Sequence, residues 1–168
     1  MKTLILAAAL TAAPTLAALA DAPGITVTDA YARSTNPRSG AVFMTVANAN
    51  AADCRITAAT ADVTPRAELH THAEENGMMK MTPVEAVTIP AGGTHALERG
   101  GDHVMLMALE TPLKDGDKVA LTLDLGACGT LPVEAVVDNK RPASGHAGGH
   151  AGGHAGGHAG HTMPMPAN

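Results

Sequence analysis

Apolar and polar residues alternate in short runs along most of this 168-residue chain. Turns rich in Gly, Pro, Asn and Asp, such as NPRSG, PAGG and RGGD, separate the runs. The expected strands are 25–33, 40–49, 53–61, 66–72, 78–81, 86–89, 94–98, 103–110, 118–125 and 131–138. No window between them sustains the 3.6-residue period of an amphipathic helix. The pattern predicts an all-β sandwich or barrel of Greek-key type.

The N-terminus has the pattern of a secretory signal. Lys2 precedes an apolar run, and Ala18-Leu19-Ala20 stands before Asp21. A membrane anchor is the alternative, but the run is short and Pro14 interrupts it. We therefore expect a cleaved signal peptide over residues 1–20 and a soluble, monomeric protein in the periplasm, without stable insertion into the membrane.

Composition narrows the choice of partner. The formal net charge is −5 and no basic patch is visible, which argues against nucleic acid. Tyr31 and Phe43 are the only aromatic residues, whereas the chain holds 9 Met and 9 His. The core must therefore be built from aliphatic side chains, and the abundant histidines and methionines become candidates for metal chemistry.

Two cysteines, Cys54 and Cys128, fit an oxidising compartment, where an even number usually means a disulfide. A bond closing so long a loop would stabilise the fold by about 4 kcal/mol. Two unpaired buried thiols and metal ligation remain as alternatives. Neither cysteine has a histidine or a second cysteine near it in sequence, so no zinc-type or CxxC motif is present.

The composition changes after the predicted domain of residues 21–141. Residues 142–168 form a low-complexity tail of Gly, Ala and His. Its candidate ligands are His146, His150, His154 and His158, at every fourth residue, followed by His161, Met163 and Met165. The many glycines disfavour a helix, and a His-rich composition predicts metal binding. A solubilising spacer with incidental histidines is the alternative.

The segment DHVMLM carries the first part of a second candidate site. Strand alternation places His103, Met105 and Met107 on one face and Val104 and Leu106 on the other. The second face is ordinary core material. The first face aligns an imidazole with two thioethers.

The segment LHTHAEENGMMKM carries the other part. His70 and His72 share one face of a strand, as do Met79 and Met81. The turns EENG, PAGG and RGGD allow both segments to approach DHVMLM. Several neighbouring strands are thereby expected to direct nitrogen and sulfur ligands at one point.

The residue types select a metal. Thioether sulfur is neutral and soft and favours Cu(I), whereas imidazole also accepts Cu(II), Zn²⁺ and Ni²⁺. The candidate Cu(I) ligands are His70, Met81, His103 and Met105, with His72, Met79 and Met107 as possible auxiliary ligands. Methionine often only fills a core, so Met79 and Met107 have packing as their alternative, and Met44 is expected to be core. His95 is expected to be exposed or hydrogen-bonded.

The spacing His70-x10-Met81-x21-His103-x-Met105 resembles the signature of the PCu(A)C family of periplasmic copper chaperones. The likeness covers about residues 24 to 138, although His72 stands where family members often carry Met. It implies a cupredoxin-like β-sandwich that binds Cu(I) through these four residues. It also implies copper delivery to the copper-bearing subunit of cytochrome c oxidase, together with a Sco-type thioredoxin-like chaperone. The tail is similar to extensions that bind Cu(II) in some members.

The sequence also bears on three other classes of protein. A blue-copper electron carrier needs a Cys thiolate with two His and an axial Met, and neither cysteine has such neighbours. An enzyme is not expected, because no nucleophile–base motif stands out. A copper, nickel or zinc buffer or resistance protein would use the same ligands without specific delivery, so this alternative stays open.

Overall fold

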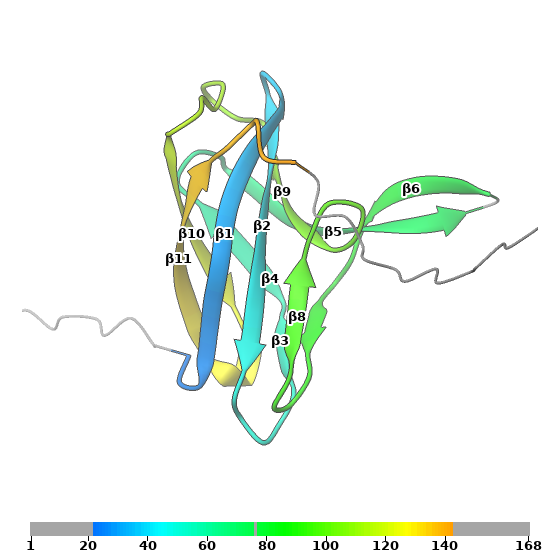
Figure 1. Cartoon of the computed structure of the whole chain (residues 1–168), viewed down its shortest axis with the longest axis vertical. Coiled ribbons are helices and arrows are strands. Elements are labelled where there is room, and N and C mark those ends of the chain that lie inside the picture. Colours follow the sequence, from blue (N-terminus) through cyan, green and yellow to red (C-terminus); the bar gives the residue numbers. More distant parts are fainter. Residues whose placement is uncertain (1–21, 76, 143–168) are drawn as a thin grey trace, which may run out of the picture.

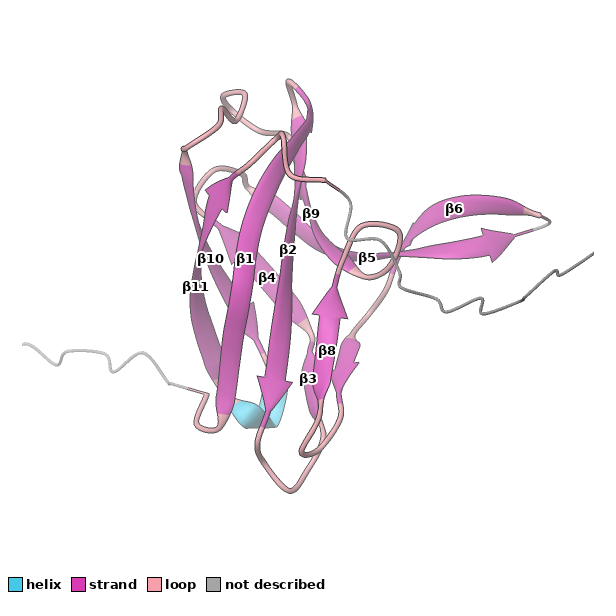
Figure 2. Ribbon diagram, viewed as in Figure 1, coloured by secondary structure: helices cyan, strands magenta, loops and turns pink. Residues whose placement is uncertain are grey.

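The computed structural model describes residues 22–75 and 77–142. The predicted signal peptide lies outside the described residues, as do the candidate tail ligands His146, His150, His154, His158, His161, Met163 and Met165. Within the described ranges the chain is built from strands and turns, apart from one short 3₁₀ helix, η1 (Gly126–Cys128) (Figure 2). None of the described residues belongs to a helix long and apolar enough to cross a membrane.

The strands follow the predicted pattern closely. They are β1 (Ile25–Asn36), β2 (Ser39–Asn48), β3 (Cys54–Ile56), β4 (Ala58–Ala61), β5 (Arg66–Glu75), β6 (Met78–Pro83), β7 (Val87–Ile89), β8 (Thr94–Leu97), β9 (His103–Met107), β10 (Lys118–Asp124) and β11 (Thr130–Val137). The expected run 53–61 is two strands, because β3 pairs with β7 whereas β4 pairs with β10. Strand β9 ends earlier than expected, since Ala108 has a φ of 59° and turns the chain.

The strands form one large sheet and one small one (Figure 1). The order in the large sheet is β4-β10-β11-β1-β2-β9-β5-β6, with β8 also paired to β2. The small sheet holds β3 and β7. β1 and β11 are parallel, while the neighbouring pairs β1–β2 and β10–β11 are antiparallel. Because β5 and β6 end this order, their hairpin projects from the body of the molecule (Figure 1).

Strand alternation fills the core, as the pattern predicts. Val104 and Leu106 of β9 are fully buried, and Leu69 of β5 and Met44 of β2 belong to the same apolar cluster. The burial of Met44 agrees with its expected role as a core residue. A second, smaller cluster lies on the opposite face, where Met105 packs against apolar residues of β1 and β2. Its buried members are Tyr31, Ala41 and Phe43. Apolar side chains thus pack on both faces of the sheet near β9.

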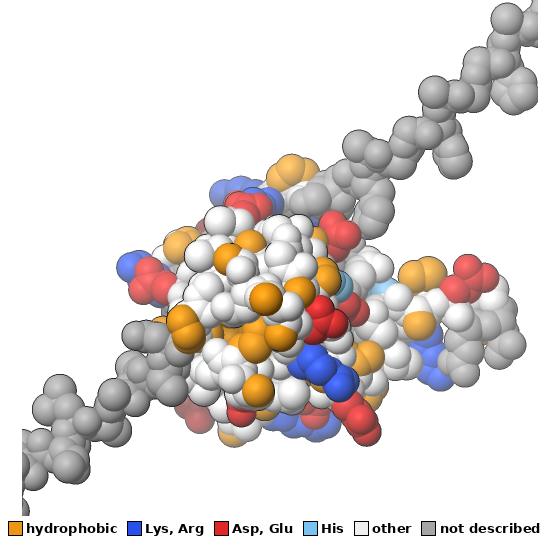
Figure 3. Space-filling model, turned by 90° about the horizontal axis from the view of Figure 1, so that it is seen from below, with side chains coloured by type: hydrophobic (Ala, Val, Ile, Leu, Met, Phe, Trp, Pro, Cys, Tyr) orange, Lys and Arg blue, Asp and Glu red, His pale blue; other side chains and the backbone are white. Residues whose placement is uncertain are grey.

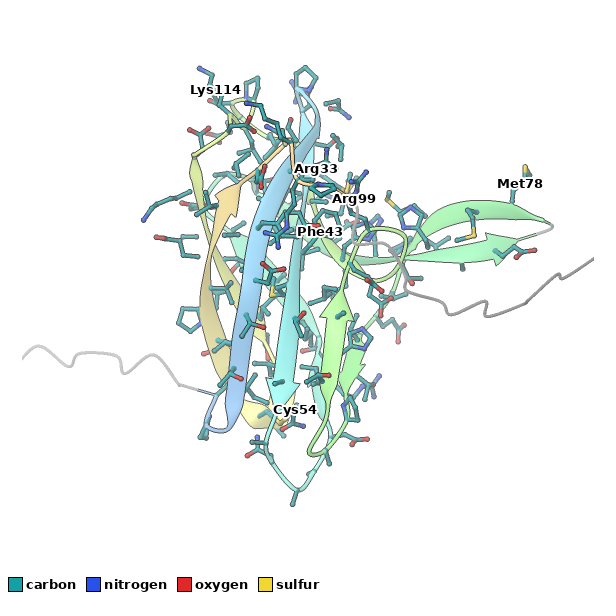
Figure 4. The ribbon with its side chains drawn as sticks, viewed as in Figure 1. Arg33, Phe43, Cys54, Met78, Arg99 and Lys114 are labelled. Carbon is teal, nitrogen blue, oxygen red and sulfur yellow. A yellow bond between two sulfur atoms is a disulfide. The ribbon has the colours of Figure 1, made fainter. Side chains whose placement is uncertain are left out.

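Cys54 and Cys128 are joined in a disulfide, with their Cα atoms 5.9 Å apart. The bond ties the start of β3 to η1 and so links the small sheet to the connection between β10 and β11. In Figure 4, Cys54 lies toward one end of the sandwich, away from Phe43 and Arg99. With both thiols paired here, neither is a free thiolate that a blue-copper centre requires.

Candidate metal centre

Three adjacent strands bring the predicted ligands to one face of the sheet. His70 of β5 lies directly opposite His103 of β9, and His72 lies directly opposite Met81 of β6. Met105 follows two residues after His103 and therefore faces the same side. The faces predicted from the alternation are thus assembled into one cluster by antiparallel pairing.

The cluster borders a pocket of about 410 Å³. The lining residues are Thr35, Ala41, Phe43, His72, Met81, Arg99, Gly100, His103 and Met105. His70 does not line the pocket, but its ring centroid is 6.0 Å from that of His103. A larger hollow of about 580 Å³, beside β4, β10 and β11, has no histidine or methionine among its lining residues. Candidate metal chemistry therefore belongs to the smaller pocket.

His103 is the most deeply buried of the candidate ligands, with 1% of its surface exposed. Its Nδ1 lies 3.0 Å from the carbonyl oxygen of Gly101, so Nδ1–H donates this hydrogen bond. Its Nε2 is buried and has no hydrogen-bond partner among the described residues. Burial holds the pKa of His103 below its usual value, which favours the neutral imidazole. The ring therefore keeps a lone pair on Nε2 for a metal ion.

His70 is oriented by a carboxylate. Its Nε2 lies 3.0 Å from Oε2 of Glu68, whose Oε1 accepts a hydrogen bond of 2.6 Å from Nε of Arg66. The hydrogen bond from His70, reinforced by Arg66, lowers the pKa of Glu68. With Nε2–H donating to Glu68, the lone pair of His70 is on Nδ1, which is buried and unpartnered within the described chain. His70 thus offers Nδ1, whereas His103 offers Nε2.

His72 supplies a third imidazole at the edge of the same cluster. Its ring centroid is 5.3 Å from that of His103, and its Nδ1 is also buried without a hydrogen-bond partner in the described part of the molecule. Three unpaired ring nitrogens in one place require an explanation, because buried polar atoms are normally hydrogen-bonded. A metal ion bound by one or two of these nitrogens together with thioether sulfur would account for lone pairs in this cluster.

The methionines differ in position. Met105 is half-buried beside Phe43, while Met81 is 41% exposed. Met79 is 62% exposed and lies further out on β6, opposite Glu74. Met107 lies opposite Ser39 and is not part of the pocket lining. The structure therefore places Met105 and Met81 at the pocket, and Met79 and Met107 beyond it.

Two groups of supporting residues were not foreseen from the sequence. Glu68 shares a strand face with His70, two residues earlier, and this spacing is the signal that could have identified it. The ring of Phe43 lies 5.9 Å from that of His103 and 5.1 Å from that of Tyr31. These are the chain's only aromatic residues, which was their available signal.

Arg141 and His95 make contacts outside the candidate ligand set. The guanidinium of Arg141 lies 4.1 Å above the ring of Tyr31 and forms an ion pair with Asp29. The described part of the chain, which ends just after Arg141, therefore ends on the side of the sheet that carries Phe43 and His103. His95 is hydrogen-bonded to Asp102 at 2.8 Å, as expected for a residue outside the ligand set.

The donor chemistry is that of a soft-metal site. Over the described ranges, His, Cys, Asp and Glu side chains alone do not form a group of three that could hold a metal ion. The cluster at the pocket combines imidazole nitrogens with the uncharged thioethers of Met81 and Met105. Thioethers bind monovalent soft cations and have little affinity for Mg²⁺ or Ca²⁺.

The sequence of this domain is similar to a known protein family and to a curated relative. Residues 25–137 match the family model described as "Putative lipoprotein LpqE-like". A curated relative, "Putative lipoprotein Lxx21020" of Leifsonia xyli subsp. xyli, is 32% identical over 117 residues, which cover 69% of this chain and 70% of that protein.

Solved structures show the same fold. The apo PCuAC domain from PmoF1 aligns with a TM-score of 0.59 and 18% identity, over 70% of this chain and 96% of that one. The solution structure of CuI-DR1885 from Deinococcus radiodurans aligns with a TM-score of 0.52 and 37% identity, over 71% and 83% of the two chains. These likenesses confirm the all-β sandwich and the predicted resemblance to PCu(A)C. The chain belongs to the LpqE-like family, with a fold of the PCuAC type.

Proposed function

We propose that this protein is an exported copper carrier that binds Cu(I) through His70, His103, Met105 and Met81. The observation that carries the proposal is the pair of buried imidazole nitrogens, one on each of two neighbouring strands, that lack hydrogen-bond partners among the described residues and belong to the sheet face that carries Met81 and Met105. The 37% identical Deinococcus protein, whose structure was solved in a Cu(I) form, supports the same metal.

The donor set suits the oxidation state. Two thioethers and two imidazoles satisfy the low coordination number and softness of Cu(I) without a thiolate. In an oxidising compartment, paired thiols would tend to form a disulfide, as Cys54 and Cys128 do here. Thioethers avoid that reaction and oxidise only to sulfoxides. His72, opposite Met81, offers an additional or alternative nitrogen.

X-ray absorption at the copper edge tests this proposal. We expect the Cu(I)-loaded mature protein to show mixed nitrogen and sulfur scattering from a three- or four-coordinate ion. The double variant His103→Ala, Met105→Ala should lose that mixed signal. A parent protein that binds no Cu(I), or a variant with the same spectrum, would contradict the assignment.

Delivery distinguishes a chaperone from a buffer. We infer that the protein acts as a carrier rather than an enzyme and passes copper to an acceptor, with the copper-bearing subunit of cytochrome c oxidase and a Sco-type protein as the expected partners. The site has a buried ligand, His103, and a partly exposed ligand, Met81, and an exposed ligand supports exchange of the ion with an acceptor. Transfer from the loaded protein to an apo acceptor domain, faster than release into buffer, is the expected result. Release at the same rate with and without acceptor would favour a copper buffer.

The histidine tail is proposed to bind Cu(II) separately. Arg141, the penultimate described residue, is anchored on Tyr31, whose ring contacts Phe43 and through it His103. The described chain thereby ends on the side of the sheet that carries the pocket. Deleting residues 142–168 should abolish most Cu(II) binding, measured by electron paramagnetic resonance. Unchanged Cu(II) binding would refute the separate site.

Export is supported by the predicted signal peptide and by the lipoprotein descriptions of the family and the relative. We propose the periplasm, or the envelope more generally, as the site of action. Mass spectrometry of the purified mature protein should find an N-terminus near Asp21. A retained leader would contradict the predicted cleavage.

A further inference from the structure

The outer strand of the projecting hairpin carries an unusual set of exposed side chains. Met78 is 70% exposed, Met79 is 62% exposed and Met81 is 41% exposed. Among the described residues, Val136 is the only other large apolar side chain with comparable exposure. Figure 3 shows hydrophobic side chains along the hairpin where it projects from the body. Exposed thioethers are accessible to a soft metal ion.

Strand alternation divides these methionines between two faces. Met79 and Met81 point to the face of the candidate metal centre, whereas Met78 points to the opposite face. Figure 4 shows Met78 far out on the hairpin, distant from Phe43. Cα atoms two residues apart on a strand are separated by about 6.6 Å, so the thioethers of Met79 and Met81 can reach a common ion.

The donors on this face form a series from the interior to the surface. His103 and His70 form its buried end, with 1% and 8% exposure. The pair of His72 and Met81 comes next, and Met79 lies beyond it. His72 contributes an Nδ1 that is buried and lacks a partner within the described chain. Glu74, across from Met79, adds a negative charge that attracts a cation.

We propose that Met79, Met81 and His72 form an outer Cu(I) subsite, through which the ion leaves the inner site. This inference rests on the proposed function of that inner site. Met81 is shared by the two positions, so the ion can exchange its bonds to His70, His103 and Met105 for bonds to Met79 and His72 without release into water. Copper remains Cu(I) throughout, and only metal–ligand bonds break and form, so no electron or proton has to be supplied.

Transfer kinetics on the full mature chain test the outer subsite. One equivalent of Cu(I) is loaded, and its capture by excess bathocuproine disulfonate is followed by absorbance. Met79→Leu should slow capture about tenfold, equivalent to about 1.4 kcal/mol in the barrier. Met78→Leu should keep both the parent's capture rate and the parent's affinity for the first Cu(I). Met78→Leu is the matched control, because it removes an equally exposed thioether from the opposite face of the same strand.

The outcomes separate the two proposals. If Met79→Leu and Met78→Leu both transfer copper at the parent rate, or are slowed equally, the outer subsite is wrong while the inner site stands. If the parent chain does not hold the first Cu(I) with Met81 and Met105, the proposed function itself fails. Methyl resonances of ¹³C-labelled methionine report this directly, since Met81 and Met105 should shift with the first equivalent. Met79 should shift, and Met78 should not, when more Cu(I) is added.

Discussion

The two halves of the candidate metal centre use similar ligands in very different settings. Strand β9 lies between β2 and β5, and its His103 is almost fully buried and hydrogen-bonded to Gly101. Strand β6 is at the edge of the sheet and, of the described strands, pairs with β5 alone, and its Met81 is 41% exposed. The half on β9 is held in place by a neighbouring strand on each side. The half on β6 has a neighbouring strand on one side.

This difference in burial assigns the retention of copper to the ligands on β9 and its release to the ligands on β6. A ligand embedded in the sheet can move only if its strand leaves the ladder, whereas edge hairpins open locally at low free-energy cost. A carrier has to bind copper tightly and still yield it to an acceptor. Placing one ligand group on β9 and another on β6 meets both requirements within a single site.

The largest effect is expected from the buried half. His103→Ala should lower Cu(I) affinity by more than about 100-fold, since losing a residue that only supports a ligand already costs about 10- to 100-fold. Competition with a Cu(I) chelator of known affinity measures the change. The thermal midpoint and amide spectrum of the apo variant show whether it is folded. A folded variant with an affinity within about tenfold of the parent would exclude His103 as a ligand.

A smaller effect compares the two thioethers directly. Met105→Leu should weaken Cu(I) binding about tenfold more than Met81→Leu does, a difference of about 1.4 kcal/mol. The physical reason is that His72, opposite Met81, can replace the lost sulfur. The same chelator competition measures both variants. Equal losses would show that the buried and exposed halves contribute alike.

The next effect concerns the orientation of His70. Glu68→Gln removes the charge that fixes Nε2–H, and should reduce Cu(I) affinity by about tenfold. Long-range ¹H–¹⁵N spectra of the imidazoles should show a mixture of tautomers in the apo variant. Glu134→Gln is the matched control, because Glu134 forms an exposed ion pair with Lys118 on another strand pair. A single unchanged tautomer of His70 would remove Glu68 from this role.

The smallest effect is a pH dependence of the apo fold. Because burial lowers the pKa of His103, the unfolded chain binds its proton more readily than the folded chain does. The contribution of His103 to stability is therefore complete above about pH 6.5, the unfolded value, and is lost as the pH falls below it. Thermal midpoints measured across this range should fall less steeply for His103→Asn than for the parent. Parallel slopes would place the pH dependence elsewhere.

Much of the fold could be predicted from local pattern. A strand needs only alternation and bounding turns, so the runs around β2, β9 and β10 were predicted to within a few residues. The break at Thr57 was not, because it depends on β3 and β4 choosing different partners. The end of β9 before Ala108 was not predicted either, because it depends on a positive φ that alanine rarely adopts.

The candidate ligands likewise have some features that local sequence predicts and others that only the tertiary structure decides. Alternation and spacing sufficed to place His70 with His72, Met79 with Met81, and His103 with Met105, because a strand's side-chain period is a local property. Glu68 and Gly101 each stand two residues before a histidine, but the ring orientation fixed in the folded sheet decided that different nitrogens of His70 and His103 are bonded. Tertiary structure alone decided that one ligand is buried and another exposed, because burial depends on which strands, distant in sequence, become neighbours.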